Sequence, residues 1–176
     1  MTAASICPKT SYCPAQTSSV NNLSIVCPAG TYNPIENIGK SSDCMPCKVG
    51  HYCTGGTFDS TKLCDETYYC PIGQSQATFV DVYVMGTNKG GTCPEGYTCA
   101  KGADAPKPCP VGTYGPSVKA TECKPCPPGK FCDEVALSNS VFALKDKLCD
   151  VGYYCKGSAT ISHPPDDATG GICPAG

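Results

Sequence analysis

The residues of this chain that could carry chemistry are two Cys-x-x-Cys pairs, Cys44-Met-Pro-Cys47 and Cys123-Lys-Pro-Cys126. Two cysteines at this spacing can ligate zinc, form a thiol–disulfide redox centre, or enter structural disulfides. The three interpretations need different neighbours. Zinc requires further His or Cys ligands, a thioredoxin-type centre requires a strand-to-helix context, and structural disulfides require more distant cysteines.

An internal repeat argues against zinc at these pairs. Cys44, Cys47 and Cys53 reappear 79 positions later as Cys123, Cys126 and Cys132. His51 is the one candidate for a further ligand in the first copy, and Lys130 occupies its position in the second. Neither copy has a strand-to-helix pattern around the motif. The sequence therefore favours structural disulfides, and we expect no metal site and no cofactor.

Acid–base catalysis has few candidates in this sequence. Besides His51, the chain contains only His163, which lies in the segment Ser-His-Pro-Pro-Asp-Asp with Asp166 and Asp167. One histidine and two adjacent carboxylates in a polar loop do not make a metal cage, so we interpret this segment as a solvated turn. No nucleophile has an evident catalytic partner, and we expect that the protein is not an enzyme.

The composition predicts a small, disulfide-rich fold. The chain of 176 residues contains 17 cysteines, 19 glycines and 17 prolines, but no tryptophan and only four phenylalanines. Such a chain cannot bury a large apolar core, so crosslinks must supply part of its stability. We expect an elongated array of cysteine-rich modules with short β-strands and little regular secondary structure. Because disulfides persist in oxidising compartments, we place the protein outside the cell or on its surface.

The charge and hydropathy of the chain limit the kinds of partner that we expect for it. The net charge is −2, all 13 basic residues are lysines, and the lysines do not cluster, so nucleic acid is not an expected partner. No apolar run reaches the roughly 20 residues that span a bilayer, and no signal peptide is visible before the first cysteine. Asn22 begins the sequon Asn-Leu-Ser and is the predicted site of an N-linked glycan.

The repeat divides the chain into five segments. Two six-cysteine modules occupy residues 27–70 and 109–155, and both open with the sequence Cys-Pro-x-Gly-Thr-Tyr. A partial repeat precedes them (1–26), a linking element with Cys93 and Cys99 separates them (71–108), and the start of a further repeat follows (156–176).

Two apolar insertions interrupt the cysteine pattern. Residues 78–85 alternate valines with other side chains and predict a β-strand. Residues 140–145 predict a short strand or one helical turn, and their length does not decide between them. The aromatic residue that precedes the last cysteine of each Gly-x-aromatic-Cys segment is expected to pack on sulfur; an exposed ladder of tyrosines for ligand contact is the alternative.

The motif order Cys-Pro-x-Gly-Thr-Tyr, Ser-x-Cys, Cys-x-x-Cys and Gly-x-Tyr-Cys resembles the ephrin-receptor-like and TNF-receptor-like cysteine-rich repeats over about two thirds of the chain. The resemblance implies small stacked modules without catalytic activity, in which the first cysteine pairs with the second, the third with the fifth, and the fourth with the sixth. The implied pairs are Cys27–Cys44, Cys47–Cys64, Cys53–Cys70, Cys109–Cys123, Cys126–Cys149 and Cys132–Cys155. The short pairs left over are Cys7–Cys13 and Cys93–Cys99.

This pairing leaves Cys173 unpaired or available for an intermolecular disulfide. Cys173 begins Cys-Pro-Ala-Gly, as Cys27 does, so we expect the array to continue in a longer chain or in a partner chain. A different frame, with Cys70–Cys93 and Cys155–Cys173, would instead leave Cys7 without a partner. Spacing alone does not choose between connectivities.

These features favour an extracellular structural protein, the repeat-built protomer of a fibre, surface appendage or coat, such as a mastigoneme-like hair. Repeat modules with open ends can associate head to tail into a polymer. A receptor ectodomain or a cell-surface ligand-binding module is the alternative, and a variable surface antigen is a third, weaker hypothesis.

Overall fold

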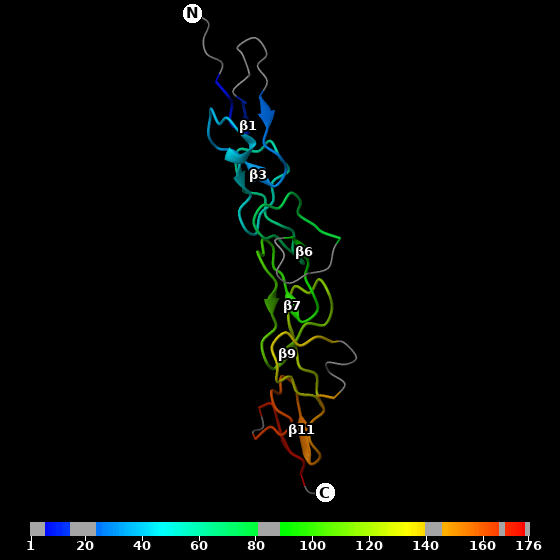
Figure 1. Cartoon of the computed structure of the whole chain (residues 1–176). Coiled ribbons are helices and arrows are strands. Elements are labelled where there is room, and N and C mark those ends of the chain that lie inside the picture. The colour runs from blue at the N-terminus through cyan, green and yellow to red at the C-terminus, as the bar shows by residue number, and fades with distance from the viewer. Residues whose placement is uncertain (1–5, 15–23, 81–88, 140–145, 166–167, 175–176) are drawn as a thin grey trace, which may run out of the picture. The chain divides into compact units, whose positions relative to one another are not determined.

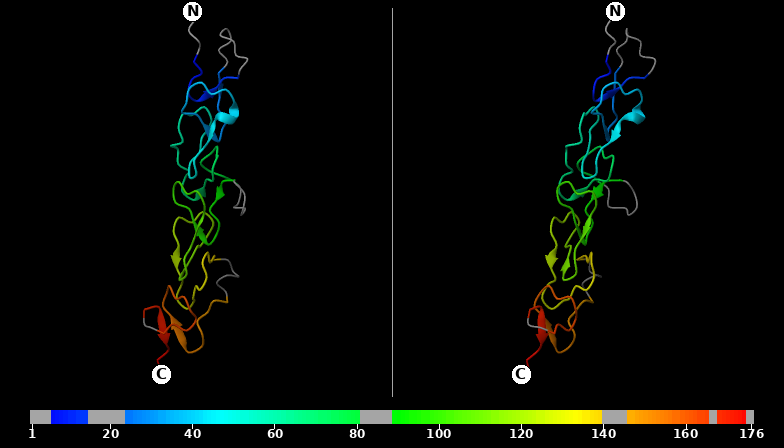
Figure 2. Two further views of the ribbon diagram at one scale, coloured as in Figure 1. Left: turned by 60° about the vertical axis from the view of Figure 1, so that its left-hand side comes forward. Right: turned by 90° about the vertical axis from the view of Figure 1, so that its left-hand side faces the viewer.

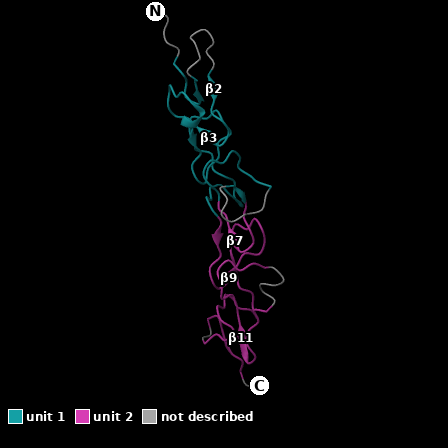
Figure 3. Ribbon diagram, viewed as in Figure 1, with its two compact units in different colours: residues 1–91, 101–105 teal, residues 92–100, 106–176 magenta. Residues whose placement is uncertain are grey.

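The computed structural model of the chain describes residues 6–14, 24–80, 89–139, 146–165 and 168–174. Figure 1 shows the chain, and Figure 3 shows its division into two compact units, residues 1–91 with 101–105 and residues 92–100 with 106–176. The boundaries of the five predicted segments stay predictions.

Regular secondary structure is sparse in the described residues, as the short arrows in Figures 1 and 2 show. These residues contain no α-helix and one 3₁₀ turn, η1, which covers Ser41–Asp43. The strands have two or three residues and form two-stranded sheets. The pairs are β1 (Ser11–Tyr12) with β2 (Ile25–Val26), β3 (Thr31–Tyr32) with β4 (Met45–Pro46), β5 (Tyr68–Tyr69) with β6 (Gly91–Thr92), β7 (Tyr97–Thr98) with β8 (Lys107–Pro108), β9 (Thr113–Tyr114) with β10 (Lys124–Pro125), and β11 (Tyr153–Cys155) with β12 (Gly170–Ile172). The predicted small disulfide-rich fold with little regular secondary structure is confirmed.

One seven-residue element, which we call the cysteine turn, recurs through both units. Its first residue is a cysteine and its fourth has a positive φ. The turns start at Cys7, Cys27, Cys47, Cys64, Cys93, Cys109, Cys126 and Cys149. In most of them the N–H of the fifth residue donates to the carbonyl of the second, as Thr31 does to Pro28 at 3.1 Å. A closed turn with a left-handed third residue has the form of a type II turn, which explains the glycine at position four of most copies.

Backbone hydrogen bonds stack the cysteine turns of unit 1. The N–H of the first cysteine of one turn donates to the carbonyl of the left-handed residue of the turn before it: Cys47 to Gly30 at 2.9 Å, and Cys64 to Gly50 at 3.0 Å. In return, the left-handed residue donates to the seventh residue of the next turn, as Gly50 N does to Cys70 O at 2.7 Å. We call this repeated pattern the turn ladder.

A second left-handed residue, which we call the hook, follows each described turn from Cys27 onward and completes the ladder. Its N–H donates back to the first cysteine carbonyl of the preceding turn. The hooks of unit 1 are Asn37, Gly56, Gly73 and Gly102, bonded to Cys7, Cys27, Cys47 and Cys64 respectively. Each turn is thus tied to its neighbours by main-chain atoms, which any sequence able to adopt positive φ at the right positions can supply.

The same ladder runs through unit 2. The N–H groups of Cys109, Cys126 and Cys149 donate to the left-handed glycines of the preceding turns at 2.9–3.2 Å. The hooks are Lys119, Ala136 and Ser158, bonded to Cys93, Cys109 and Cys126 respectively. Cys173 N also donates to Gly152 O, at 2.9 Å, which is the same hydrogen bond that the first cysteines of these turns make.

Cystines replace the apolar core. Most of the buried apolar residues in the described part of the chain are half-cystines, and Tyr69, Ala120, Leu137 and Ala159 are buried with them. In unit 2, Leu137 packs with the buried Cys126–Cys132 disulfide, and Tyr114 covers this cluster. Here an aromatic residue of one turn lies on the disulfide of the next. Tyr114 is not one of the aromatic residues of the Gly-x-aromatic-Cys segments, for which packing on sulfur stays a prediction.

Eight disulfides join the cysteines, and four of the predicted pairs are wrong. Cys7–Cys13, Cys27–Cys44, Cys93–Cys99 and Cys109–Cys123 are present as expected. In place of Cys47–Cys64, Cys53–Cys70, Cys126–Cys149 and Cys132–Cys155, the structure has Cys47–Cys53, Cys64–Cys70, Cys126–Cys132 and Cys149–Cys155. The alternative pairs Cys70–Cys93 and Cys155–Cys173 are also absent.

The cysteine turn itself explains the local pairing. It brings its first and seventh residues to Cα–Cα distances of 5.7–6.2 Å, inside the range that a disulfide bridges. Two turns have Asn33 or Gly115 in the seventh position instead of cysteine. Their first cysteines, Cys27 and Cys109, therefore pair forward with Cys44 and Cys123.

The two predicted apolar insertions lie mostly outside the described residues. Of the predicted strand 78–85, residues 78–80 are described and are not in a strand, and the rest falls outside. The segment 140–145 falls outside entirely.

Proteolysis without reduction tests the connectivity. Trypsin cleaves after Lys62 and Lys89 and after Lys147 and Lys156, so the corrected pairing releases residues 63–89 and 148–156 as peptides that each contain one internal disulfide. Mass spectrometry should find both peptides free at acidic pH, where disulfide exchange is slow. Recovery of 63–89 linked to peptides containing Cys47 and Cys53 would restore the rejected pairing.

The stacking of the turns predicts that two equivalent glycines differ in tolerance. A Cβ at Gly96 would lie 2.0 Å from the hook carbonyl of Ala136, whereas a Cβ at Gly129 meets no atom within 4 Å. Both have φ near +80°, so both alanine variants lose about 1–2 kcal/mol to left-handed strain. Gly96→Ala should lose about 1–3 kcal/mol more because backbone must move. Equal unfolding free energies for the two variants, measured in guanidinium, would contradict the stacking.

Candidate functional site

The two Cys-x-x-Cys motifs are structural in this fold. Cys44 and Cys47, separated by two residues, pair in different directions, with Cys27 and Cys53 respectively. Cys123 and Cys126 do the same with Cys109 and Cys132. All four sulfurs are oxidised, and neither motif forms a disulfide within itself. These sulfurs therefore supply neither zinc thiolates nor a Cys-x-x-Cys redox pair.

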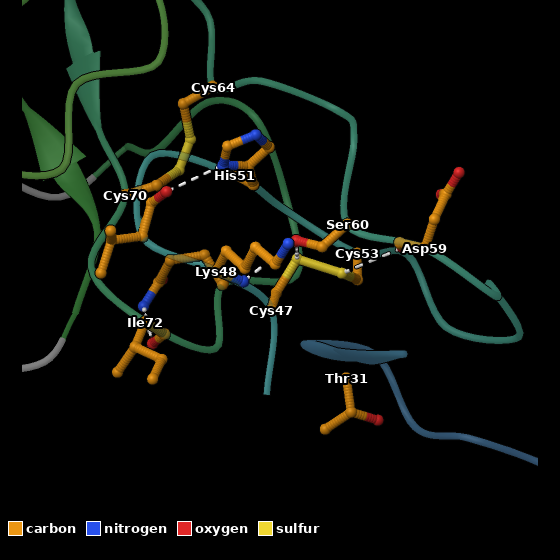
Figure 4. The surroundings of a disulfide bond; sticks show 12 residues. Thr31, Cys47, Lys48, His51, Cys53, Asp59, Ser60, Cys64, Cys70 and Ile72 are labelled. Carbon is orange, nitrogen blue, oxygen red and sulfur yellow. Dashed lines mark hydrogen bonds between the residues drawn. A yellow bond between two sulfur atoms is a disulfide. The ribbon is translucent and has the colours of Figure 1, made fainter. Parts of the chain in front are cut away.

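The surroundings of the Cys47–Cys53 disulfide show how it is held (Figure 4). Ser60 is buried; its hydroxyl lies 3.2 Å from the Cys47 sulfur and accepts the Lys48 N–H at 3.0 Å. Ser60 thereby satisfies a backbone donor next to a sulfur that is fully buried. This arrangement stabilises a crosslink.

His51 and Lys130 occupy equivalent places, as the repeat predicts. Each lies in the fifth position of its turn and forms an isolated antiparallel bridge, His51 with Leu63 and Lys130 with Leu148. The His51 Nδ1 lies 2.8 Å from the Val49 carbonyl, so a local contact orients the ring. Among the described residues, no three His, Cys, Asp or Glu side chains gather where they could hold a metal ion.

A Ser–His–Asp cluster lies at the last complete turn of unit 2. Ser162 Oγ donates to Asp150 Oδ2 at 2.8 Å, and His163 Nδ1 lies 3.2 Å from that hydroxyl and 3.3 Å from that carboxylate. No pattern in the sequence indicates this cluster, because Asp150 is distant from His163 and the two segments are joined by a backbone hydrogen bond from Asp150 N to Ser162 O. Asp166 and Asp167 lie outside the described residues.

The geometry of this cluster differs from that of a hydrolytic triad. In a triad the imidazole stands between the other two groups, with the carboxylate on one nitrogen and the hydroxyl on the other. Here both groups face Nδ1, and the serine proton is given to Asp150. All three contacts are exposed to solvent. The cluster fastens the segment around Ser162 to the turn rather than activating a nucleophile.

One cleft in unit 1 has mixed polar lining. It has a volume of about 550 Å³, is open to solvent, and is lined by Asp65, Glu66, Thr67, Tyr68 and Lys101. Its lining includes the fourth position of the Cys64 turn, where Thr67 has φ 73° in place of the usual glycine. The Tyr68 ring contacts the Phe79 ring, with ring centroids 6.5 Å apart. The cleft offers an aromatic ring beside two carboxylates and one ammonium.

Among the described residues, Lys147 has a pKa that its neighbours raise. Its Nζ lies 2.6 Å from Asp133 Oδ1, 2.9 Å from Glu134 Oε1 and 5.5 Å from the Phe131 ring centre. The hydrogen bonds to Asp133 and then to Glu134 raise the pKa of Lys147 above its usual 10.5. Because Phe131 N also donates to Lys147 O at 3.1 Å, this group closes the base of the long connection between Cys132 and Cys149.

Two further predicted site residues are Cys173 and Asn22. Cys173 is the free cysteine and is exposed. Asn22, the predicted glycan acceptor, lies outside the described residues, so glycosylation stays a prediction. No helix among the described residues is long and apolar enough to cross a membrane.

No protein-family model matches the sequence of this chain, and no curated protein matches it either. The coarse assignment therefore comes from the molecule itself. Eight disulfides in 176 residues indicate a cysteine-rich module that folds in an oxidising compartment, in an extracellular or secreted protein.

The Lys147 group predicts a local, pH-dependent contribution to stability. In Lys147→Met the amide of Phe131 should exchange faster, by the equivalent of about 0.2–1 kcal/mol, because the ion pairs at the base of the connection are lost. The pKa of Lys147 is raised by folding, so this contribution is complete below pH 10.5 and is lost as the pH rises through the folded pKa.

Hydrogen exchange at the Phe131 amide should therefore distinguish wild type from Lys147→Met at neutral pH. It should separate them less above pH 10.5, with Lys107→Met, an exposed lysine of β8, as control. A pH-independent difference would assign the effect to packing alone.

Proposed function

We propose that this chain is an extracellular structural protein, the repeat-built protomer of a fibre, surface appendage or coat. The observation that carries the proposal is the turn ladder, in which the same main-chain bonds and one disulfide per turn recur along each unit. A fold of this kind needs no shared apolar core. It can be lengthened turn by turn without redesign, which suits a spacer or building unit.

The ladder also separates the scaffold from the side chains. Because the bonds between turns are backbone bonds, the exposed residues of the turns and of their connections are free to vary in length and type. The second and third turn positions show this freedom, since they are Lys48-Val49 in one copy, Asp65-Glu66 in the next and Pro110-Val111 in another. Such a protein presents varied surfaces at regular steps on a constant frame, as the units of a coat do.

We propose further that the chain has no catalytic activity. Its motif cysteines are consumed in disulfides, and the one Ser–His–Asp cluster directs both partners to the same imidazole nitrogen. The polar cleft beside Tyr68 contains two carboxylates that are exposed and an ammonium that offsets them. None of these arrangements supplies an activated nucleophile.

Self-association head to tail is the mode of assembly that fits best with a repeat of this kind. Contacts between unlike ends of identical protomers produce open filaments whenever the rotation between them does not close a ring. N-linked glycans on Asn22 would add bulk without entering the ladder.

A ligand-binding module of the cell surface, such as a receptor ectodomain, is the second candidate. The cleft lined by Tyr68, Asp65, Glu66 and Lys101 favours it, because an aromatic ring beside groups of both charges is a surface on which a partner's side chains can dock. The structural assignment is preferred because the ladder extends through both units, whereas the cleft is a single open feature.

Direct observation of assembly tests the proposal. The purified, oxidised protein should form particles that grow with concentration in sedimentation velocity and appear as filaments or sheets in negative-stain electron microscopy. Cys173→Ser is the matched variant, because it removes the one free thiol and separates non-covalent assembly from disulfide-linked dimers. Protein that stays monomeric from micromolar to millimolar concentration, with and without the thiol, would overturn the structural assignment in favour of the binding module.

A further inference from the structure

The turn ladder has a recurring hydrogen bond whose donor is the backbone N–H of the first cysteine of a turn. For Cys27, Cys47 and Cys64 in unit 1, the acceptor is the carbonyl of the left-handed residue of the preceding turn, at 2.9–3.0 Å. Cys109, Cys126, Cys149 and Cys173 in unit 2 repeat the arrangement. This donor is therefore the group through which one turn is added to another.

At Cys7 a side chain takes over the role of that carbonyl. Cys7 N donates to Asn37 Oδ1 at 3.0 Å, and the N–H of Asn37 donates in return to Cys7 O at 3.0 Å. The backbone of residue 37 and its amide group thus hold both main-chain polar groups of one cysteine. Cys7 is itself buried, so this pairing also satisfies a donor with little access to water.

Asn37 is a hook residue, and its side chain differs from that of Lys119, the equivalent hook in the second cysteine repeat. Its φ is 62°, in the left-handed region that asparagine tolerates better than most residues. Lys119 occupies the same place in the second cysteine repeat, has φ 63°, and likewise donates its N–H to the first cysteine, Cys93. A lysine side chain has no acceptor. The backbone bond of the hook is common to both copies, whereas the amide clasp is particular to Asn37.

We propose that Asn37 caps the ladder at the Cys7 turn and keeps this edge from pairing with a turn of a second copy of the chain. An unpaired backbone N–H beside a row of hydrogen-bonding groups is a template for the addition of another chain. The natural occupant is a second copy, because the N–H groups of the other cysteines named above donate to the backbone carbonyl of a like turn. The inference rests on the proposed function in one respect, since it names the edge at which assembly is restrained.

Removal of the amide tests the cap. Asn37→Gly keeps the left-handed backbone and the N–H bond to Cys7 O but deletes the acceptor, and the side chain is exposed, so the fold is preserved. Asn37→Asp keeps an acceptor oxygen, and Lys119→Gly makes the same glycine substitution at a hook without a clasp. Hydrogen exchange at the Cys7 amide and the initial rate of association by light scattering are measured for all three variants and for wild type.

The expected result is specific to one variant. In Asn37→Gly the Cys7 amide should exchange roughly threefold to tenfold faster, the equivalent of one lost hydrogen bond, and association should be faster than in wild type. Asn37→Asp and Lys119→Gly should behave as wild type in both measurements. Unchanged exchange at Cys7, or unchanged association despite faster exchange, would each overturn the cap.

The same measurements distinguish failure of the Asn37 cap from failure of the proposed structural function. Wild type that stays monomeric while Asn37→Gly associates would refute native self-assembly and support the cap. Wild type that assembles at the same rate as Asn37→Gly would refute the cap and leave the structural function standing.

Discussion

The hydrogen bond between the first cysteine of one turn and the left-handed carbonyl of the turn before it is the interaction on which this structure depends. It fixes the distance between consecutive turns and sets which side chains face the gap between them. The glycines follow from it, since a Cβ at Gly50 or Gly96 would lie 2.3 or 2.0 Å from a hook carbonyl. Left-handed residues are thus required twice in each step, once within the turn and once at the hook. This requirement, more than any apolar pattern, organises the chain.

Disulfides make such a ladder stable. Two-residue strands and isolated turns lose backbone entropy without burying much apolar surface, so they would not persist alone. A disulfide across six of the eight cysteine turns restricts the unfolded chain, and the Cys126–Cys132 disulfide provides the buried sulfur that the Tyr114 ring covers. Where the seventh residue is not cysteine, other bonds compensate. Buried Asn33 donates from its amide to Ser11 O at 2.9 Å and accepts the Ile35 N–H at 2.9 Å.

Polar clusters in this fold lie on the connections between turns and serve to fasten them. Lys147 with Asp133 and Glu134 closes one connection, and Asp150 with Ser162 and His163 fastens another. Ser60 does the same from a buried position beside the Cys47–Cys53 disulfide. The groups that resemble chemical sites are therefore the anchors of variable loops. This arrangement supports the proposed structural role.

The sequence by itself determined the fold class, the oxidising compartment, the internal repeat and the structural nature of the Cys-x-x-Cys motifs. These follow from composition and from the His51-to-Lys130 comparison, which depend on residue type alone. Only the tertiary structure decided the pairing of Cys47, Cys53, Cys64 and Cys70, because several pairings satisfy the same spacing and the backbone of the turn selects one. It also decided the ladder, the Asn37 clasp and the Asp150–His163 contact. Each of these joins residues distant in sequence through main-chain or local polar groups, and such contacts leave no periodic pattern of side chains to be recognised beforehand.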